Sequence, residues 1–345
     1  MSSLLTVAAA AAILVWVLVA IVRQLSLRWH LYDHPNARSS HVVPTPRLGG
    51  VALALVLGGG FWAAGSWGPP EWQGLGWLVL AGVGTVVALV SLVDDLRPLP
   101  AVVRFAVHAG AAVTVVGLAG PLDAVGLGAF ALPLPGWLGT AVVLLWVAGF
   151  INAFNFMDGI DGIAGGQALV AGLGWMLLGH VLAAPALLVA GALLVGSALG
   201  FLAHNWSPAS IFMGDAGSAL LGFLLSASPL LLAGPDAWLP SVLLVWPFVF
   251  DTALTLVRRA MSGEPVWQAH RTHLYQRLVA CGHSHRRVAT LYMALAAVGG
   301  AVGVFTVGSA RGPMWMTLVI GAGAMALWFV VRWCERSAKV AALPP

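Results

Sequence analysis

The feature that most constrains the fold is a series of eleven apolar runs, each about 17 to 22 residues long and almost free of charge. An α-helix of this length crosses the ~30 Å hydrocarbon core of a bilayer. Only 8% of the 345 residues are charged and the mean hydropathy is +0.94, whereas soluble domains carry about 25% charged residues. The sequence therefore predicts an all-α, polytopic transmembrane bundle of about 11 spans, with 10 as the alternative count. The runs cover residues 4–22, 49–67, 74–93, 102–120, 138–154, 162–180, 183–203, 216–233, 238–257, 288–309 and 314–333.

Basic residues predict the orientation of this bundle. If alternate loops are cytoplasmic, starting with residues 23–48, fifteen of the sixteen Lys and Arg residues fall at or near that face, and only Arg311 falls outside. We therefore expect the N-terminus outside and the C-terminus in the cytoplasm. The first run lacks a basic segment before it, so we expect an uncleaved span. The net charge of +4 is then an orientation signal. No basic stretch is interleaved with aromatic residues, so nucleic-acid binding is not expected.

The chain is expected to form one integral-membrane domain over residues 1–345, because no linker or fixed-period repeat divides it. Most acidic residues and most histidines fall on the cytoplasmic side, and the outer loops are short. Cys281 and Cys334 lie on the same reducing side, so we expect no disulfide. The active site is therefore expected in the cytoplasmic loops, at residues 23–48, 94–101, 155–162, 204–215 and 258–287.

The stretch NAFNFMDGIDGIAGG, residues 152–166, places amides and carboxylates at every third position directly after an apolar run. Positions three apart spread around a helix instead of sharing one narrow face. Gly159 and Gly162, each of which directly follows one of the aspartates, predict that the helix ends or bends there. We expect a polar pocket at the membrane boundary, with Asn155, Asp158 and Asp161 pointing into it and suited to the hydroxyls and ring edge of a nucleoside.

Adjacent carboxylates, Asp94 and Asp95, end the third apolar run in SLVDDLRPLP. Neighbouring helical residues diverge by about 100°, so one can face a cavity while the other braces it. Two like charges at a membrane boundary are costly unless a cation or a basic partner offsets them. A solvated acidic turn is the alternative interpretation.

Another carboxylate, Asp215, lies in HNWSPASIFMGDAGS, residues 204–218. Gly217 and Ser218 follow it, and their small side chains are expected to leave room for a ligand. Asp215 is alternatively a helix N-cap, a role that would not prevent it from binding a metal.

Two cytoplasmic segments supply cations. DHPNARSSHVVPTPRLGG, residues 33–50, is a loop rich in Pro and Gly. In residues 258–287, His270, His273 and Arg277 follow an i, i+3, i+7 pattern that predicts an interfacial amphipathic helix with one basic face. Binding of lipid headgroups is the alternative for both segments. The histidines disfavour it in the second segment, because lysine or arginine binds anionic lipid better at neutral pH.

Carboxylates beside a basic row are suited to phosphoryl transfer. Mg²⁺ commonly binds one or two carboxylates together with substrate phosphates, and Arg and His neutralise the remaining phosphate charge. A site at the membrane boundary implies one lipid substrate and one soluble substrate. No zinc-ligand spacing, Walker loop or GxSxG elbow is present. DGIDGIAGG evokes the CDP-alcohol phosphotransferases, but their DGxxAR pattern is absent.

The motifs together resemble the polyprenyl-phosphate N-acetylhexosamine-1-phosphate transferases over about residues 33–290. Each motif alone is weak, but five in this order on one face of a polytopic protein are specific. They are PTPRLGG, DDLRPL, NAFNFMDGIDGIAGG, NWSPASIFMGDAGS and AHRTHLYQRL.

The resemblance implies an Mg²⁺-dependent enzyme, with Mn²⁺ as the alternative ion. It implies transfer of a sugar-1-phosphate from a UDP-N-acetylhexosamine to undecaprenyl phosphate, with release of UMP. Direct attack is favoured over a phosphorylated aspartate, because the lipid phosphate is already mostly dianionic near pH 7. The implied site is on the cytoplasmic face of the bacterial inner membrane, and a homodimer is one candidate assembly.

The resemblance also implies residue roles. Asp215 is the main metal ligand, Asp94 is the base or orienting group for the lipid phosphate, and Asp95 supports Asp94 and contacts the metal. The implied nucleotide pocket consists of Asn155, Asp158, Asp161, Asn205 and Phe212, with the phenyl ring stacking on uracil. The implied pyrophosphate and sugar contacts are His270, Arg271 and His273, with Arg38 and His41 nearby.

Departures from the family pattern narrow the expected branch. The peptidoglycan branch, phospho-N-acetylmuramoyl-pentapeptide transferase, has lysine in DDxxK, where this chain has Pro98. The chain is more similar to the branch that initiates O-antigen and teichoic acid, with UDP-GlcNAc or a UDP-6-deoxy-N-acetylhexosamine such as UDP-FucNAc or UDP-QuiNAc as donor. The peptidoglycan enzyme is one alternative. A membrane transporter is another, but it would have charges near mid-span and paired half-sequences.

Overall fold

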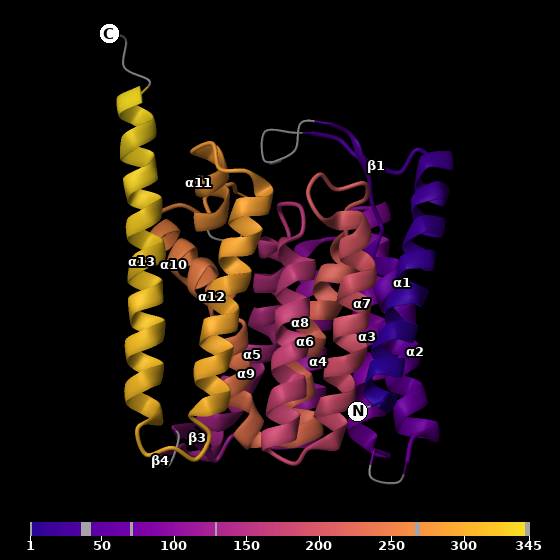
Figure 1. Cartoon of the computed structure of the whole chain (residues 1–345), viewed down its shortest axis with the longest axis vertical. Helices are drawn as coiled ribbons and strands as arrows, with labels where there is room; N and C mark the ends of the chain where they lie inside the picture. The colour runs from indigo at the N-terminus through magenta and orange to yellow at the C-terminus, as the bar shows by residue number, and fades with distance from the viewer. Residues whose placement is uncertain (1, 36–42, 70–71, 128–129, 266–269, 342–345) are drawn as a thin grey trace.

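Helices dominate the computed structural model, which describes all residues except 1, 36–42, 70–71, 128–129, 266–269 and 342–345 (Figure 1). Within the described residues, ten helices are long and apolar enough to cross a membrane, and a pair of helices joined at a 73° bend brings the count to as many as eleven. Each expected apolar run coincides with one of these eleven units. The prediction of an all-α multi-pass membrane protein is therefore confirmed.

Most of the long helices follow one another with short connections, as expected for neighbouring antiparallel spans. The longer connections are those between α1 and α2, between α4 and α5, and between α8 and α12. They are α1 (Ser2–Arg28), α2 (Gly50–Trp67), α3 (Leu75–Leu96), α4 (Ala101–Ala119), α5 (Gly136–Met157), α6 (Ile163–Val181), α7 (Pro185–Asn205), α8 (Asp215–Ala233), α12 (His285–Phe305) and α13 (Gly312–Ala341). The shorter helices are η1 (Pro235–Ala237), α9 (Trp238–Leu244), α10 (Trp246–Met261) and α11 (Leu274–Ala280). Two antiparallel strand pairs complete the fold, β1 (Tyr32–Asp33) with β2 (Thr45–Pro46) and β3 (Ala124–Leu127) with β4 (Phe130–Pro133).

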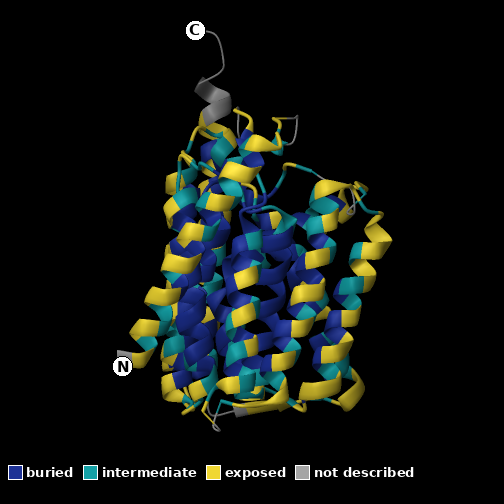
Figure 2. Ribbon diagram, turned by 90° about the vertical axis from the view of Figure 1, so that its right-hand side faces the viewer, coloured by how far each residue is buried: buried dark blue, intermediate teal, exposed yellow. Residues whose placement is uncertain are grey.

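The most deeply buried of the long helices are α6, α7 and α8. Figure 2 shows the buried residues, in dark blue, in the interior of the bundle. Glycines allow α6 and α7 to approach closely: a Cβ added to Gly172 would lie 3.0 Å from the carbonyl oxygen of Gly191. Lipid tails are as apolar as the helices, so close van der Waals packing of this kind is a main force between spans.

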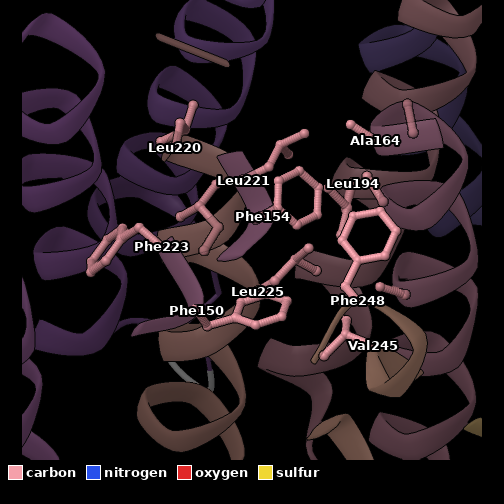
Figure 3. Close-up of a cluster of buried hydrophobic side chains, with 14 of the residues drawn as sticks. Phe150, Phe154, Ala164, Leu194, Leu220, Leu221, Phe223, Leu225, Val245 and Phe248 are labelled. Atoms are coloured by element: carbon pink, nitrogen blue, oxygen red, sulfur yellow. The ribbon is translucent and has the colours of Figure 1, made fainter. Parts of the chain in front are cut away.

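Aromatic rings join α5 and α10 in the core, and apolar side chains of α8 lie in the same cluster (Figure 3). The ring centroids of Phe154 and Phe248 are 5.3 Å apart, and those of Phe150 and Phe154 are 6.0 Å apart. Phe154, Phe223 and Phe248 are fully buried. This cluster gives the last turns of α5, which carry polar residues, a rigid base.

The span predicted at residues 238–257 is broken, not continuous. α9 and α10 meet at Val245 with a bend of 73°. Pro247 lies in the first turn of α10, where its missing N–H has no intrahelical partner to lose, whereas in an unbroken helix its ring would clash with the preceding turn. The buried side chain of Gln167 on α6 donates to the carbonyl of Leu244 at 2.8 Å. This bond gives the Leu244 carbonyl, which lies at the break between α9 and α10, a hydrogen-bond donor that lipid cannot supply.

The prediction of one amphipathic helix carrying His270, His273 and Arg277 within residues 258–287 is wrong. α10 ends at Met261, and Gly263 follows with a φ of +69°, a conformation that favours glycine. α11 begins only at Leu274 and has His273 at its N-cap. His270 and Arg277 therefore do not share one helical face with His273, and the predicted cationic row does not form.

Candidate active site

A pocket of about 410 Å³ opens at the end of the bundle that carries β1 and α11, the upper end in Figure 1. This volume is within the range of small-molecule sites. The walls come from the ends of α3, α5, α8 and α12, the α5–α6 turn, and residues beside β1, β2 and α11. The lining residues are Asp33, Arg47, Asp94, Asp95, Asn155, Asp158, Gly159, Ile160, Asp161, Asn205, Phe212, Met213, Gly214, Asp215, Gln276 and His285.

Backbone hydrogen bonds join the segment after β2 to the loop before α8. The amide of Phe212 donates to the carbonyl of Pro46 at 2.8 Å. The amides of Gly49 and Gly50 donate in return to the carbonyls of Phe212 and Met213, at 2.9 and 2.8 Å. Two motifs far apart in sequence therefore form one wall of the pocket.

Gly217 and Ser218 do not enlarge the pocket for a ligand, as the sequence had suggested. The Gly217 backbone packs against Gly50 of α2, and a Cβ on either glycine would collide with the other. The Ser218 hydroxyl donates to Oδ1 of Asn155 at 3.2 Å. Both small residues therefore serve packing around the pocket, one between α2 and α8 and the other between α5 and α8.

Asp95 caps α8 from another helix. Its two carboxylate oxygens accept hydrogen bonds from the backbone amides of Asp215 and Ala216, both at 3.0 Å. These amides are among those that a helix N-terminus leaves without intrahelical partners. The N-cap position itself is occupied by Gly214 with a φ of +78°. The alternative that Asp215 is an N-cap is therefore wrong, and its side chain is available to the pocket.

The cost of the adjacent carboxylates is offset by Arg104 on α4. Its Nη1 donates to Oδ2 of Asp94 at 2.8 Å, and the amide of Leu99 donates to the other oxygen at 2.6 Å. The same Nη1 lies 3.9 Å from Oδ2 of Asp215. The expectation that a basic partner balances this acidic pair is confirmed, although the sequence did not identify which one.

The α5–α6 turn has the form that its glycines predict. α5 ends at Met157, and Gly162 precedes α6 with a φ of +76°. The Gly162 amide donates to Oδ1 of Asn205 at 3.0 Å, while Nδ2 of Asn205 donates to the carbonyl of Ile211 at 2.9 Å. The predicted helix end is confirmed. The polar groups of the buried Asn205 are used to hold the turn against the loop before α8.

The two aspartates of this turn have different electrostatic environments. Burial, followed by the charges of Asp215 and Asp95, raises the pKa of Asp158 to about 7. Burial also acts to raise the pKa of Asp161, but a hydrogen bond and charge interaction with His285 outweigh it, so this pKa is lowered. Nδ1 of His285 lies 3.3 Å from Oδ2 of Asp161. Asp158 therefore lacks a compensating cation near pH 7, whereas Asp161 has a fixed partner.

The pocket carboxylates fit a divalent cation that is shared with a phosphate ligand. The Asp215 side chain is 34% exposed, whereas Asp95 and Asp94 already accept the hydrogen bonds described above. Across the described residues, no group of three or more His, Cys, Asp or Glu side chains could hold a metal ion alone. Mg²⁺ often relies on one or two carboxylates, completed by water and substrate phosphates. Asp215 is the best placed of these side chains for such an ion.

Eight of the predicted site residues line the pocket, and three other described ones do not. The eight are Asp94, Asp95, Asn155, Asp158, Asp161, Asn205, Phe212 and Asp215.

His270, Arg271 and His273 are not among the lining residues. The His273 ring is buried, and its Nδ1 lies 3.2 Å from Oδ1 of Asp251. Burial, followed by the charge of His273, lowers the pKa of His270 to about 4, so this ring is neutral at pH 7. Arg38 and His41 lie outside the described residues.

Several pocket residues had no role assigned from the sequence. Arg47 follows β2, and its Nε is buried without a hydrogen-bond acceptor in the described part of the chain. Gln276 lies on α11, and His285 is the first residue of α12. The basic character of Arg47 and His285 was visible in the sequence. Their placement depends on contacts between distant segments, which no local pattern encodes.

These features define a class of protein: a multi-pass membrane protein with an acidic, amide-lined pocket where several helices end. Comparison with known proteins specifies the family. The model of glycosyl transferase family 4 matches residues 77–233. The chain is 34% identical over 336 residues to the decaprenyl-phosphate N-acetylglucosaminephosphotransferase of Mycobacterium tuberculosis, covering 86% of this chain and 81% of that protein.

Two further relatives are also named as transferases of phosphate-linked sugars. A probable undecaprenyl-phosphate N-acetylglucosaminyl 1-phosphate transferase of Bacillus subtilis is 30% identical over 285 residues, with 79% of this chain and 76% of that protein covered. A phospho-N-acetylmuramoyl-pentapeptide-transferase of Trichormus variabilis is 50% identical over 110 residues, but these are only 30% of this chain and 27% of that protein. The chain belongs to glycosyl transferase family 4, among the polyprenyl-phosphate sugar-1-phosphate transferases, and the resemblance inferred from its motifs is confirmed.

Proposed function

We propose that this protein transfers N-acetylglucosamine-1-phosphate from UDP-GlcNAc to a polyprenyl phosphate such as undecaprenyl phosphate, and releases UMP. The observation that carries the proposal is the partly exposed Asp215 carboxylate, which lies in the pocket between the Asp94–Arg104 pair and the α5–α6 turn. The names of the two long relatives support GlcNAc as the sugar. A UDP-6-deoxy-N-acetylhexosamine is the second candidate donor.

The nucleotide is proposed to bind on the α5–α6 side of the pocket. Asn155, Asp158 and Asp161 offer acceptors and an amide for the ribose and uracil, and Phe212 offers a ring for stacking. Mg²⁺ held by Asp215 would stabilise negative charge on the pyrophosphate. Arg47 lines the same pocket and offers a guanidinium for phosphate oxygens.

The acceptor lipid is proposed to bind on the α3–α4 side. Arg104 is 39% exposed and already pairs with Asp94, so it can also bind the lipid phosphate at the membrane boundary. An oxygen of that phosphate attacks the phosphorus bonded to the sugar. The bond between this phosphorus and the oxygen bridging the two phosphates breaks, and that oxygen leaves on UMP. One pyrophosphate bond replaces another, so the reaction is near balance.

The pocket is proposed to face the cytoplasm, where UDP-sugars are made, with the N-terminus outside and the C-terminus inside the bacterial cytoplasmic membrane. The one-sided distribution of Lys and Arg supports this orientation. The product would start the synthesis of O-antigen or another envelope polysaccharide.

The test is UMP release by the protein purified in detergent, with undecaprenyl phosphate, Mg²⁺ and one UDP-N-acetylhexosamine at a time. We expect release with UDP-GlcNAc that requires both lipid and metal, together with a lipid diphosphate sugar of the matching mass. Release only with a 6-deoxy donor would correct the sugar. No release with any donor, from protein that stays folded, would overturn the proposal.

A further inference from the structure

Asp251 on α10 is a fully buried carboxylate outside the pocket lining. An unpaired charge at such a position would be strongly destabilising. Its oxygens are instead surrounded by donors from three elements. Oδ1 contacts the amide of Leu274 at 2.7 Å, Nδ1 of His273 at 3.2 Å and the hydroxyl of Thr255 at 3.2 Å, while Oδ2 accepts from the amide of Tyr275 at 3.1 Å and the hydroxyl of Tyr292 at 2.6 Å.

This carboxylate is connected to the α5–α6 turn through Tyr275. The bond from the Tyr275 amide to Asp251 fixes the start of α11, and the Tyr275 side chain is almost fully buried. Its hydroxyl donates to the carbonyl of Phe156 at 3.0 Å, in the last turn of α5. Any Cβ at Gly159 would collide with this hydroxyl. Tyr275 therefore fits closely against the turn on both sides of Asp158.

The two helices that donate hydrogen bonds to Asp251, α11 and α12, also each supply a residue to the lining of the pocket. Gln276 follows Tyr275 on α11 and lines the pocket. Tyr292, the hydroxyl donor to Asp251, lies on α12, whose first residue His285 also lines the pocket and contacts Asp161. The break before α10 allows this arrangement, because it directs the helix that carries Asp251 toward α11 and α12.

We propose that Asp251 is a positioning residue for the donor side of the pocket, acting through Tyr275 on the turn that carries Asp158 and Asp161. This inference rests on the proposed function, in which that turn binds the sugar nucleotide. Asp251 touches no substrate. It holds the start of α11 so that the Tyr275 hydroxyl can fix the position of the turn.

The test compares two matched substitutions, Tyr275→Phe and Tyr292→Phe. Tyr275→Phe removes the hydroxyl that bonds to the turn and keeps the amide bond to Asp251, whereas Tyr292→Phe removes a hydroxyl that bonds to Asp251 and not to the turn. We expect Tyr275→Phe to raise KM for UDP-GlcNAc about 3- to 10-fold, as expected for one lost hydrogen bond, with KM for undecaprenyl phosphate unchanged. Tyr292→Phe should leave the donor KM within about twofold. Equal effects of the two variants, or equal rises in both KM values, would overturn the proposal.

A double-mutant cycle then tests the link to Asp251 itself. If Asp251 acts through Tyr275, adding Tyr275→Phe to Asp251→Asn should raise the donor KM no further. Effects that multiply in the double variant would overturn the proposal. An unchanged donor KM in Tyr275→Phe would also overturn it, because that variant loses the bond to the turn while it keeps the amide bond to Asp251. An inactive wild-type protein would instead contradict the proposed function, so the two failures are distinguishable.

Discussion

The acidic residues of the pocket and the buried Asp251 network solve the same problem in opposite ways. Asp251 is fully buried, and five donors surround its two oxygens. In the pocket, Asp215 is partly exposed, lies beside two other carboxylates and has its nearest cation, Arg104, 3.9 Å away. A carboxylate with all its acceptor capacity used is suited to holding structure. One with capacity left is suited to binding a ligand.

The largest expected effect is the loss of activity when the charge of Asp215 is removed. Asp215→Asn should lower the rate of UMP release about 10²- to 10³-fold, as does the loss of a group that stabilises transition-state charge. The thermal midpoint should stay the same or rise, because the substitution also removes repulsion from Asp95 and Asp94. Activity measured over a range of Mg²⁺ concentrations, beside a thermal melt, checks both effects. A variant that keeps more than a tenth of the activity would contradict the role of Asp215.

At Asp251, by contrast, we expect removal of the charge to lower the stability of the protein. Asp251→Asn places an amide group where donors from α11 and α12 converge, so it should destabilise the protein by about 3 kcal/mol. Thermal melts in detergent of this variant and of Asp215→Asn give the comparison. If Asp251→Asn melts at or above the midpoint of Asp215→Asn, the distinction between the two kinds of carboxylate is wrong.

Arg104 is expected to have an intermediate effect, because it serves both Asp94 and the proposed lipid phosphate. Arg104→Gln should raise KM for undecaprenyl phosphate about tenfold, the size expected for a charged hydrogen bond, with a smaller change in KM for the donor. Arg104→Lys, which keeps the charge but not the planar fork, is the matched control and should recover part of the loss. A rise confined to the donor KM would place the acceptor elsewhere.

The effect of pH is spread over several pH units. Burial raises the pKa of Asp158 from the ordinary aspartate value of 3.8 to about 7, so between these pH values the folded state holds a proton that the unfolded chain releases. Stability without a divalent cation should therefore fall as pH rises from about 4 to 7, by at most about 1.4 kcal/mol per pH unit from this group. Melts of wild type and Asp158→Asn in EDTA should show a shallower fall in the variant. Parallel curves would exclude Asp158 as the source.

Sequence reasoning succeeded where a feature depends on neighbouring residues. The apolar runs predict the spans because a helix of fixed rise must match the bilayer thickness. The α5–α6 turn was predictable because Gly159 and Gly162 lie among its polar residues, and Asn155, Asp158 and Asp161 do line the pocket. These are local properties of the chain.

It failed where the partner lies far along the chain. Asp95 caps α8 from 120 positions away, and nothing beside either residue predicts that contact. Asp251 stands in a run whose hydropathy does not distinguish a bent span from a straight one. The histidines at 270 and 273 have helical spacing, but Gly263 and the late start of α11 prevent a shared face. The predicted pyrophosphate role of these histidines remains a prediction.

The bend at Val245 also has a consequence for biogenesis. The segment from Trp238 to Met261 carries Asp251, whose hydrogen-bond donors on α11 and α12 are synthesised after it. At the bend of this segment, the carbonyl of Leu244 accepts its hydrogen bond from Gln167 of α6. This segment is therefore poorly suited to inserting into the bilayer on its own, before the helices that contact it are present. During synthesis, its final placement should wait until α12 has left the ribosome, so that this part of the chain completes the bundle as one late cooperative step.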